Sequence, residues 1–462
     1  MIIPRIVIAG MSGDSGKTLV SCGLSAALKK RGFKVGSFKK GPDYIDPAWL
    51  GLAAGNPCRN LDTYLMKPRN ILRSFHMGGS LADISVIEGN RGLYDGLDTE
   101  GTHSTAQLSK LLKSPVIAVI DVTKVTRTVA AIVLGCKMLD KDIDLAGIII
   151  NKVAGKRHES VIRKAVENET GVPVVGAIPK LRGKEIFPSR HLGLVTPEEH
   201  KTASIAIDNA ANAMEDHVDI DKIIELAKDT GDLKIENQDL IEKYADKEVK
   251  IGYFSDRAFS FYYPENLEHL EMKGAKLIKV SSIRDRELPE IDLLYIGGGF
   301  PETNIEDLSI NKDLMRSLKN KVENGLPVYA ECGGLMYLAQ SIEIEGKEYD
   351  LANVLPIKVK MNKKPQGHGY MEVVTDTENP YFKKGEKIRG HEFHYSNIES
   401  MVDELKTCFS VQRGTGSFRK RDGLIYKNVF AAYLHLHSLS CEGWSNAMIR
   451  QAKNYKEKMY LS

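Results

Sequence analysis

A strand, a glycine-rich loop and a helix follow one another at the start of the chain, and this arrangement constrains the fold more than any other feature. The apolar run Ile6–Ala9 predicts a buried strand, and an apolar helical pattern continues from Thr18 through Leu28. The loop between them is Gly10-Met11-Ser12-Gly13-Asp14-Ser15-Gly16-Lys17-Thr18. In such a loop, backbone N–H groups and the helix N-terminus bind phosphate groups. We therefore predict a parallel α/β domain that binds a nucleotide.

Two side chains of the loop complete this prediction. Lys17 is expected to neutralise the β- and γ-phosphate oxygens, and the Thr18 hydroxyl is expected to bind Mg²⁺. A chance glycine loop is the alternative interpretation. The residues expected to contact ATP in this loop are Gly13, Ser15, Gly16, Lys17 and Thr18.

Carboxylates follow two further predicted strands, in the segments 39–46 and 88–95. Open α/β sheets bind ligands at the carboxyl ends of their strands, so these side chains are expected to meet there. Lys39 is expected to contact the γ-phosphate. A turn or helix cap is the alternative role, and it suits Asp46 better than Asp43. The predicted Mg²⁺ ligands are Thr18, Asp43, Asp46 and Glu88. The predicted catalytic carboxylates of this half are Asp43, Glu88 and Asp95.

One cysteine of the second half lies between an apolar strand and two glycines, in the segment Tyr329-Ala330-Glu331-Cys332-Gly333-Gly334. A sharp turn there would expose the thiol of Cys332 at the tip of a sheet, where a nearby histidine can activate it. A small buried structural cysteine is the alternative. Gly298 and Gly299 follow the apolar strand Leu293–Ile296 and are predicted to form an oxyanion hole.

The strand that begins at Val429 ends in two histidines, His435 and His437, and either could take the thiol proton. An oxyanion loop, a cysteine turn and then a histidine occur in this order in class I glutamine amidotransferases, which this half resembles. His435 matches the histidine of that family, so Cys332 and His435 are the predicted catalytic pair. Where the family has an acid, this chain has His437, and the third member of the triad is left open.

Besides the phosphate loop and the cysteine turn, the chain carries a series of further motifs in order. They are Lys39-Lys40-Gly41-Pro42-Asp43-Tyr44-Ile45-Asp46, Glu88-Gly89-Asn90-Arg91-Gly92-Leu93-Tyr94-Asp95-Gly96, Asn151-Lys152-Val153, Arg190-His191-Leu192-Gly193-Leu194-Val195, Phe261-Tyr262-Tyr263-Pro264-Glu265-Asn266 and Arg389-Gly390-His391-Glu392-Phe393-His394-Tyr395-Ser396. The phosphate loop has the glycine spacing of the dethiobiotin synthetase and MinD-like branch. With these motifs, the whole chain resembles the cobyrinic acid a,c-diamide synthase (CobB/CbiA) family.

This resemblance implies a C–N bond-forming ligase that amidates the a and c acetate groups of a tetrapyrrole polycarboxylate. ATP with Mg²⁺ would activate each carboxylate as an acyl phosphate, and L-glutamine would supply ammonia. By the same resemblance Asn151 should lie beside the adenine, and the segments around Tyr262 and His391 should line the meeting place of the two domains.

Composition and charge bound the other possibilities. The 462 residues exceed what one hydrophobic core usually organises, and 42% hydrophobic with 27% charged residues is an ordinary globular composition. A net charge of +3 gives no reason to expect a nucleic-acid partner. We found no CxxC pair, signal peptide or membrane-spanning run, so we expect a reduced, cytoplasmic protein without a membrane partner. A homodimer is left open.

The predicted domains are 1–225, a P-loop doubly wound parallel sheet, and 249–462, a class I glutamine amidotransferase α/β domain. A charged linker at 226–248 should join them.

Several alternatives remain open at the level of function. Asn90, Arg91 and Lys40 replace less polar residues common in corrin enzymes, so the acceptor could be Ni-sirohydrochlorin of the F430 route or sirohaem instead of cobyrinate. Cobyric acid synthase is a further alternative within the class. From another class, the chain could be a MinD-like ATP switch fused to an inactive amidotransferase module.

Overall fold

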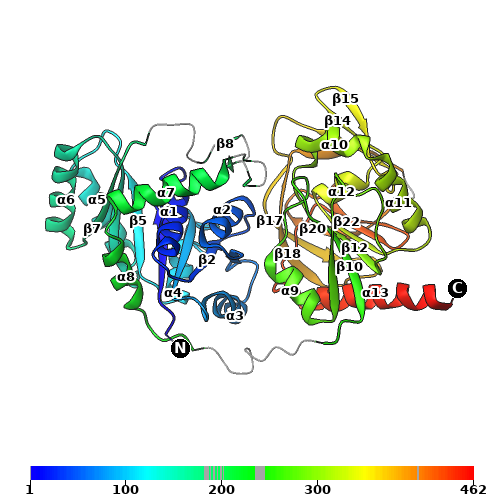
Figure 1. Cartoon of the computed structure of the whole chain (residues 1–462), viewed down its shortest axis with the longest axis horizontal. Coiled ribbons are helices and arrows are strands. Elements are labelled where there is room, and N and C mark those ends of the chain that lie inside the picture. The colour runs from blue at the N-terminus through cyan, green and yellow to red at the C-terminus, as the bar shows by residue number, and fades with distance from the viewer. Residues whose placement is uncertain are drawn as a thin grey trace. The chain divides into compact units, whose positions relative to one another are not determined.

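The computed structural model describes residues 2–181, 187, 189–190, 193–194, 196–197, 200, 202–234, 245–402 and 405–461. The chain forms two compact units, Met1–Ile241 and Glu242–Ser462, and each has its own large sheet (Figure 1). Residues 191, 192 and 195 of the family motif at 190–195, and residues 235–244 of the expected linker, lie outside the described part. Among the described residues, none of the helices has the length and apolar character needed to cross a membrane.

The first unit contains a seven-stranded sheet in the order β3-β2-β4-β1-β5-β6-β7, and every pair in it is parallel. Its strands are β1 (Arg5–Gly10), β2 (Val35–Lys40), β3 (Arg59–Leu61), β4 (Ile84–Gly92), β5 (Val116–Asp121), β6 (Leu145–Val153) and β7 (Val174–Pro179). The residues of β1 and β2 are buried throughout, as expected for strands covered on both faces. The predicted doubly wound α/β organisation is confirmed for this unit.

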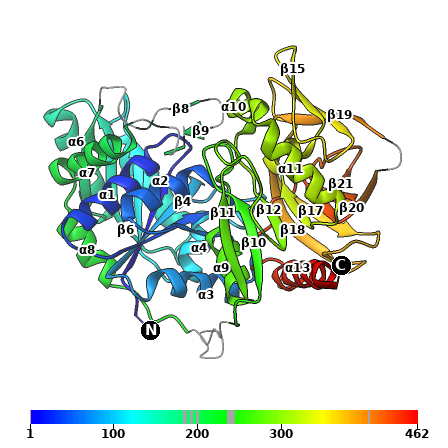
Figure 2. The same cartoon turned by 45° about the vertical axis from the view of Figure 1, so that its right-hand side comes forward.

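Helices connect these strands, and α1 lies beside α2 and α7 (Figure 2). The helices of this unit are α1 (Lys17–Lys30), α2 (Ile45–Ala54), α3 (Pro68–Gly79), α4 (Thr105–Leu111), α5 (Thr128–Leu139), α6 (Lys156–Thr170), α7 (Ala203–His217) and α8 (Ile220–Lys228). A short two-stranded sheet, β8 (Ser189–Arg190) with β9 (Gly193–Leu194), lies between α6 and α7 in the chain. Helix α8 ends slightly beyond the expected start of the linker at residue 226.

The second unit contains a nine-stranded sheet in the order β11-β10-β12-β13-β22-β21-β20-β17-β18. The strands from β11 to β22 are parallel and the others are antiparallel. They are β10 (Val249–Phe254), β11 (Ala275–Val280), β12 (Leu293–Ile296), β13 (Val328–Glu331), β17 (Gly367–Thr375), β18 (Lys387–His394), β20 (Lys406–Arg413), β21 (Arg421–Tyr426) and β22 (Val429–Ala432). A smaller sheet holds β14 (Ser341–Ile344), β15 (Lys347–Asp350), β16 (Ile357–Met361) and β19 (Ser396–Met401).

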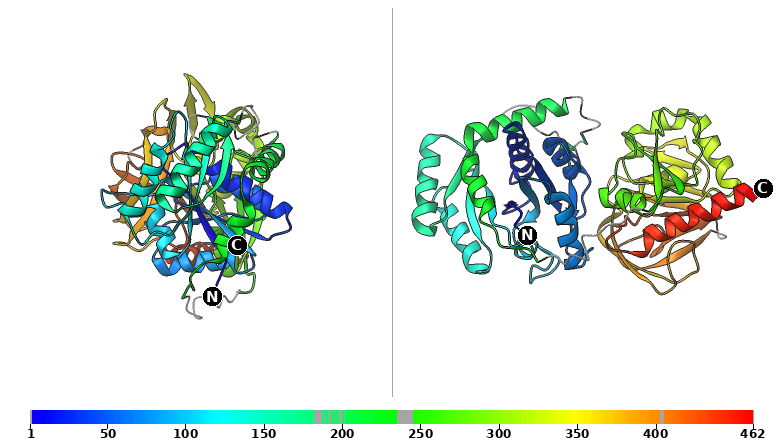
Figure 3. Two further views of the ribbon diagram at one scale, coloured as in Figure 1. Left: turned by 90° about the vertical axis from the view of Figure 1, so that its left-hand side faces the viewer. Right: turned by 60° about the horizontal axis from the view of Figure 1, so that its bottom comes forward.

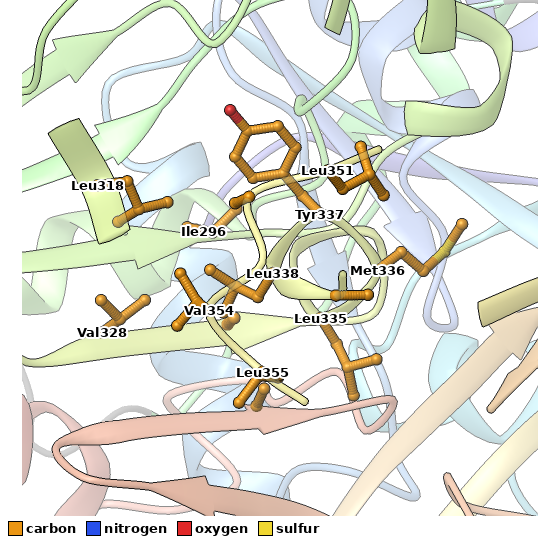
Figure 4. Packing of buried hydrophobic residues seen from close by; sticks show 14 of the residues in the cluster. Ile296, Leu318, Val328, Leu335, Met336, Tyr337, Leu338, Leu351, Val354 and Leu355 are labelled. Carbon is orange, nitrogen blue, oxygen red and sulfur yellow. The ribbon is translucent and has the colours of Figure 1, made fainter. Parts of the chain in front are cut away.

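Two apolar clusters pack this second unit. One contains Trp444 and Met448 of α13, which crosses the unit to the C-terminus (Figure 3). The other joins α12 with α11 and the strands β12 and β13, and Figure 4 shows Leu335, Tyr337 and Leu338 within it. The helices of this unit are α9 (Pro264–Met272), α10 (Ile305–Ile310), α11 (Lys312–Glu323), α12 (Gly333–Leu338) and α13 (Gly443–Leu461), with a 3₁₀ turn at Pro301–Asn304.

Candidate active sites

The loop between β1 and α1 is held in shape by a residue from the end of β6. Asn151 donates from Nδ2 to the carbonyl of Ser15 at 2.9 Å and accepts the N–H of Lys152 at its Oδ1. Gly16 has a φ of 99°, and a Cβ added there would lie 2.2 Å from Asn151 Nδ2. Only glycine fits at this position. The side chain of Asn151 packs against Gly16 and so holds the loop in place.

Polar groups of the loop are arranged for a ligand. Lys17 Nζ donates to the carbonyl of Ser12 at 2.8 Å, so its side chain folds back over the loop. Burial, with Lys39 nearby, lowers the pKa of Lys17. The hydroxyl of Ser15 is buried and has no hydrogen-bond partner among the described residues, while the space around Gly13 is open. A phosphate group would satisfy both the hydroxyl and the lysine.

Beside the loop lies a buried charge network centred on Lys39. Its Nζ contacts Glu88 Oε1 at 2.8 Å and Asp46 Oδ2 at 2.5 Å, and Thr18 Oγ1 donates to the same Glu88 oxygen at 2.8 Å. Burial opposes the charge of Lys39, but the two carboxylates outweigh it and raise its pKa. Burial also raises the pKa of Glu88, although Lys39 works against that rise. The structure thus brings together residues from α1, β2, α2 and β4.

One oxygen of this network is free to accept a cation. Glu88 Oε2 is buried and has no hydrogen-bond partner among the described residues. No group of three or more His, Cys, Asp or Glu side chains suited to a metal occurs in the described part of the chain. Mg²⁺ in nucleotide sites usually takes one or two protein ligands and completes its shell with phosphates and water. Thr18 and Glu88 fit that pattern.

The two remaining predicted carboxylates make backbone contacts. Asp43 Oδ1 accepts the N–H groups of Ile45 and Asp46 at 2.9 and 3.2 Å, at the start of α2. Burial, with Asp46 next to it, raises the pKa of Asp43 to about 7. The expectation that Asp46 suits a cap better than Asp43 is therefore wrong, because Asp46 faces Lys39. Asp95 is exposed and accepts the N–H of Gly92 at 2.8 Å.

In the second unit, Cys332 lies at the turn between β13 and α12. Its φ of 48° and ψ of −101° are strained for a residue with a side chain, and such strain is typical of a nucleophile turn. The N–H of Cys332 donates to the carbonyl of Ala432 at 2.7 Å, which ties the turn to β22. A Cβ on Gly334 would lie 2.5 Å from the carbonyl of Ile296, so the turn needs a glycine there. Burial raises the pKa of the Cys332 thiol.

The glycine loop after β12 lies against both the histidine and the cysteine turn. A Cβ added to Gly298 would be 2.5 Å from His435 Cε1, and one added to Gly333 would be 3.2 Å from the nitrogen of Gly299. Gly299 itself has a φ of 155° and passes close to the carbonyl of Ala258. The structure therefore places the predicted oxyanion loop, the histidine and the cysteine turn at one edge of the sheet.

His435 is buried and held by a second histidine. Its backbone pairs with His391 through two hydrogen bonds of 2.8 and 3.2 Å, and the two rings stack with centroids 4.7 Å apart. Burial lowers the pKa of His435 well below its ordinary value, so the imidazole is neutral at rest. The hydroxyl of Tyr263 lies 3.2 Å from His391 Nδ1. The motifs at 261–266 and 389–396 thus support the segment that carries His435.

His437 is part of a separate buried arrangement. Its Nδ1 accepts the N–H of Leu439 at 3.1 Å, and its Nε2 lies 3.6 Å from Glu265 Oε2. Asn266 donates from Nδ2 to the carbonyl of Leu436 and accepts the N–H of Ser438, both at 2.7 Å. These contacts hold the chain after His435, so we expect a structural role for His437.

Sequence reasoning missed Glu331. Its carboxyl group is fully buried beside the histidine, with Oε2 at 3.9 Å from His435 Nδ1. The signal in the sequence was a glutamate at the end of an apolar strand, directly before Cys332. Because glutamate is rarely buried without a partner, this position could have suggested a functional carboxylate.

Two family models match the chain. The CobQ/CobB/MinD/ParA nucleotide binding domain matches residues 6–195, and the CobB/CobQ-like glutamine amidotransferase domain matches residues 250–442. Curated relatives named cobyrinate a,c-diamide synthase are similar to this chain over nearly its full length. The one from Magnetococcus marinus is 41% identical over 97% of both chains. The one from Archaeoglobus fulgidus is 42% identical over 99% of both, and the one from Listeria innocua is 41% identical over 94% of this chain and 96% of its own.

The two domains together define a glutamine-dependent amidating ligase with a P-loop nucleotide-binding half. Within that class, the chain belongs to the cobyrinate a,c-diamide synthase family. The predicted family, fold class and enzyme class are confirmed, and a nucleotide switch with an inactive second module is not supported.

Proposed function

We propose that this protein amidates the a and c acetate carboxylates of a tetrapyrrole polycarboxylate, in two rounds that each use ATP and glutamine. The observation that carries the proposal is the presence of two chemically different sites in one chain: a phosphate loop with a buried charge network, and a buried cysteine and histidine beside a glycine loop. Near full-length relatives carry the name of a synthase that forms such diamides.

Activation comes first, because a carboxylate does not react with ammonia in water. A substrate carboxylate oxygen attacks the γ-phosphorus of ATP, the bond to the β-phosphate oxygen breaks, and an acyl phosphate and ADP result. Lys17 and Lys39 would stabilise the charge that moves in this step. Thr18 and Glu88 would hold Mg²⁺, which neutralises phosphate charge when bound.

Ammonia comes from glutamine at the second site. The sulfur of Cys332 attacks the side-chain amide carbon as its proton passes to His435, and the N–H groups of Gly298 and Gly299 would stabilise the oxyanion. His435 gives the proton to the leaving ammonia, and water then hydrolyses the thioester to glutamate. The ammonia displaces phosphate from the acyl phosphate, which yields the amide.

Two cationic side chains of the first unit are suited to a substrate carboxylate. Lys40 ends β2 and is only 5% exposed. Burial lowers the pKa of Lys40 and the nearby charge of Arg91 adds to this, whereas Asp62 acts in the opposite direction. Arg91 is exposed and has a φ of 53°, in a bulge where one residue of β1 faces three of β4. Asn90 fixes the bulge through two hydrogen bonds with Thr105.

These cations also bear on which macrocycle is used. Cobyrinate is the acceptor we propose. Ni-sirohydrochlorin or sirohaem is the alternative, because Lys40 and Arg91 place more positive charge at the carboxyl ends of β2 and β4 than is common in corrin enzymes. We further expect the protein to act in the cytoplasm without a nucleic-acid or membrane partner, and a homodimer stays a hypothesis for size-exclusion chromatography with light scattering.

The test is an assay of the full chain with ATP, Mg²⁺ and glutamine, and with each macrocycle in turn. Mass spectrometry should detect a monoamide and then a diamide of one macrocycle, with one ATP and one glutamine consumed per amide. Absence of any amide, or glutamine hydrolysis that no macrocycle stimulates, would overturn the proposal. An amide formed on Ni-sirohydrochlorin alone would move the assignment to that acceptor.

A further inference from the structure

Three buried histidine–glutamate pairs occur among the described residues of the second unit. Their closest distances between imidazole nitrogen and carboxylate oxygen are 3.9, 3.6 and 3.3 Å. In that order, the pairs are His435 with Glu331, His437 with Glu265, and His394 with Glu392. Of these three histidines, only His435 lies against the glycine loop. The other two pairs can therefore be compared with the His435–Glu331 pair as pairs outside the candidate site.

The other two pairs fix the backbone. His394 lies 2.7 Å from the carbonyl of Ser396 through Nδ1, and Glu392 accepts the N–H groups of Thr415 and Gly416. His437 accepts a backbone N–H, as described above. Both imidazoles therefore have at least one ring nitrogen committed to the main chain.

Glu331 instead connects the three segments of the candidate site. It directly precedes Cys332, and its Cα pairs with Ala432 in the strand that leads to His435. Its Oε1 accepts the N–H of Leu436 at 3.3 Å, and its Oε2 accepts the hydroxyl of Tyr295, in the strand before the glycine loop, at 3.3 Å. A carboxyl group held from these segments has little freedom to leave the histidine.

We propose that Glu331 is the positioning residue for His435: it accepts the Nδ1–H, directs Nε2 towards the thiol of Cys332, and balances the imidazolium charge when the thiol proton arrives. This inference rests on the proposed glutamine hydrolysis. The acid found after the histidine in related amidotransferases is thus replaced by one on the strand of the nucleophile. The distance of 3.9 Å between Nδ1 and Oε2 must shorten for a hydrogen bond, and such contacts tighten when substrate binds.

The role requires an ionised Glu331. Burial raises its pKa to about 8, so the ionised fraction increases as the pH rises towards that value. The titratable groups that face it are Tyr262, Tyr295, Tyr329, Cys332 and His435. Burial raises the pKa of each tyrosine, so they stay neutral in the working range. The rate of glutamine hydrolysis should therefore increase with pH up to a plateau, and the titration of Glu331 together with His435 sets where the plateau begins.

The experiment compares Glu331→Gln with Glu265→Gln in the full chain. The first readout is the rate of Cys332 alkylation by iodoacetamide across pH, measured by peptide mass spectrometry, because it needs no acceptor. The second is glutamine hydrolysis. Glu331→Gln should lower kcat for glutamine by about 10²-fold or more with little change in KM, abolish the pH-dependent rise, and slow alkylation. Glu265→Gln should lower the Tm but keep the pH profile of the wild type.

Each outcome decides the matter. Wild-type alkylation and hydrolysis profiles in Glu331→Gln would overturn the inference. If that variant does not fold, Tyr295→Phe replaces it. Loss of this hydrogen-bond donor to the Glu331 carboxylate should move the rise of the pH–rate profile to higher pH. A profile that does not move would overturn the inference. A wild-type protein that hydrolyses no glutamine would instead refute the proposed function, while the alkylation profiles would still test the Glu331–His435 pair.

Discussion

The two candidate sites of this protein handle buried charge in opposite ways. In the first unit, Lys39 is 2% exposed and is already paired with Glu88 and Asp46 before any ligand binds. In the second unit, burial raises the pKa of Cys332 and lowers that of His435, so both groups are neutral at rest. The first site holds its charges in advance, whereas the cysteine and histidine of the second site become charged only during the reaction.

This difference follows from the chemistry proposed for each site. Phosphoryl transfer moves negative charge, and preorganised cations stabilise it without reorganisation. A permanent thiolate would react with glutamine or oxidants when no acceptor is bound. A neutral buried cysteine that ionises only when substrate contacts its histidine avoids wasteful glutamine hydrolysis and oxidation of the thiol.

The largest effect should separate the two sites completely. Cys332→Ala should lower glutamine-dependent amidation by about 10³-fold or more, but a high concentration of ammonium salt at alkaline pH should restore the product, because only the nitrogen source is lost. Lys17→Ala should stop amidation with both nitrogen sources. Initial rates with glutamine and with ammonium check this, with Cys136→Ala, at a half-buried cysteine, as the control. If ammonium does not restore the product in Cys332→Ala, the assignment of carboxylate activation to the first site and ammonia production to the second is wrong.

A second contrast concerns the two histidines. His435→Ala should reduce glutamine hydrolysis nearly as much as Cys332→Ala. His437→Ala should mainly lower stability, because it removes a buried ring that packs on Tyr263 with centroids 4.5 Å apart. Paired measurements of kcat and Tm test this, and a larger loss of kcat in His437→Ala would reverse the assignment.

The charge network of the first unit can be tested with isosteric changes. Glu88→Gln should reduce amidation with either nitrogen source by about 10²-fold and raise the Mg²⁺ concentration needed for half-maximal rate. Asp95→Asn should have a smaller effect, because that carboxylate is exposed and accepts a backbone N–H. Rates measured against Mg²⁺ concentration decide between them. Unchanged ammonia-dependent product in Glu88→Gln would remove Glu88 from the metal site.

A smaller effect is expected at the edge where the acceptor would bind. Arg91→Met should raise the KM for the tetrapyrrole by about 10-fold and leave the KM values for ATP and glutamine near wild type, since one charge-assisted contact is lost. Lys40→Met should act in the same direction. Lys67→Met, at an exposed lysine before α3, is the matched control. Equal increases in the KM for ATP would argue against substrate recognition.

The smallest effect is on stability. The pKa of Asp43 is about 7 in the folded chain and 3.8 for an unperturbed carboxyl, so the folded state keeps a proton that the unfolded state has lost between these values. The free energy of unfolding should therefore fall as the pH rises through this window, by up to about 1.4 kcal/mol per pH unit from this group. Urea unfolding at pH 5 and pH 7 should show a shallower fall in Asp43→Asn. An unchanged slope would contradict the shift.

The sequence indicated the elements of both sites because each motif is local. A strand, a glycine loop and Lys17-Thr18 in a row leave one favourable geometry, and so do a strand, Cys332 and two glycines. Gly16 and Gly299 could be expected to matter, since both stand where only glycine avoids a clash. The predicted positions of Lys39, Glu88 and Thr18 at one edge also followed from the rule for strand ends.

Which polar groups pair with one another was decided only by the tertiary structure. Asp43, and not Asp46, makes the cap contacts, because the choice between a helix cap and a lysine partner depends on side-chain directions at the start of α2. Glu331 and His435 are far apart in the chain and meet only because β13 lies beside β22. By itself, the sequence determined the family and the fold, and it predicted the nucleophile. The network of buried partners required the folded chain, since burial and distance, which set each pKa and each hydrogen bond, are not properties of residue order.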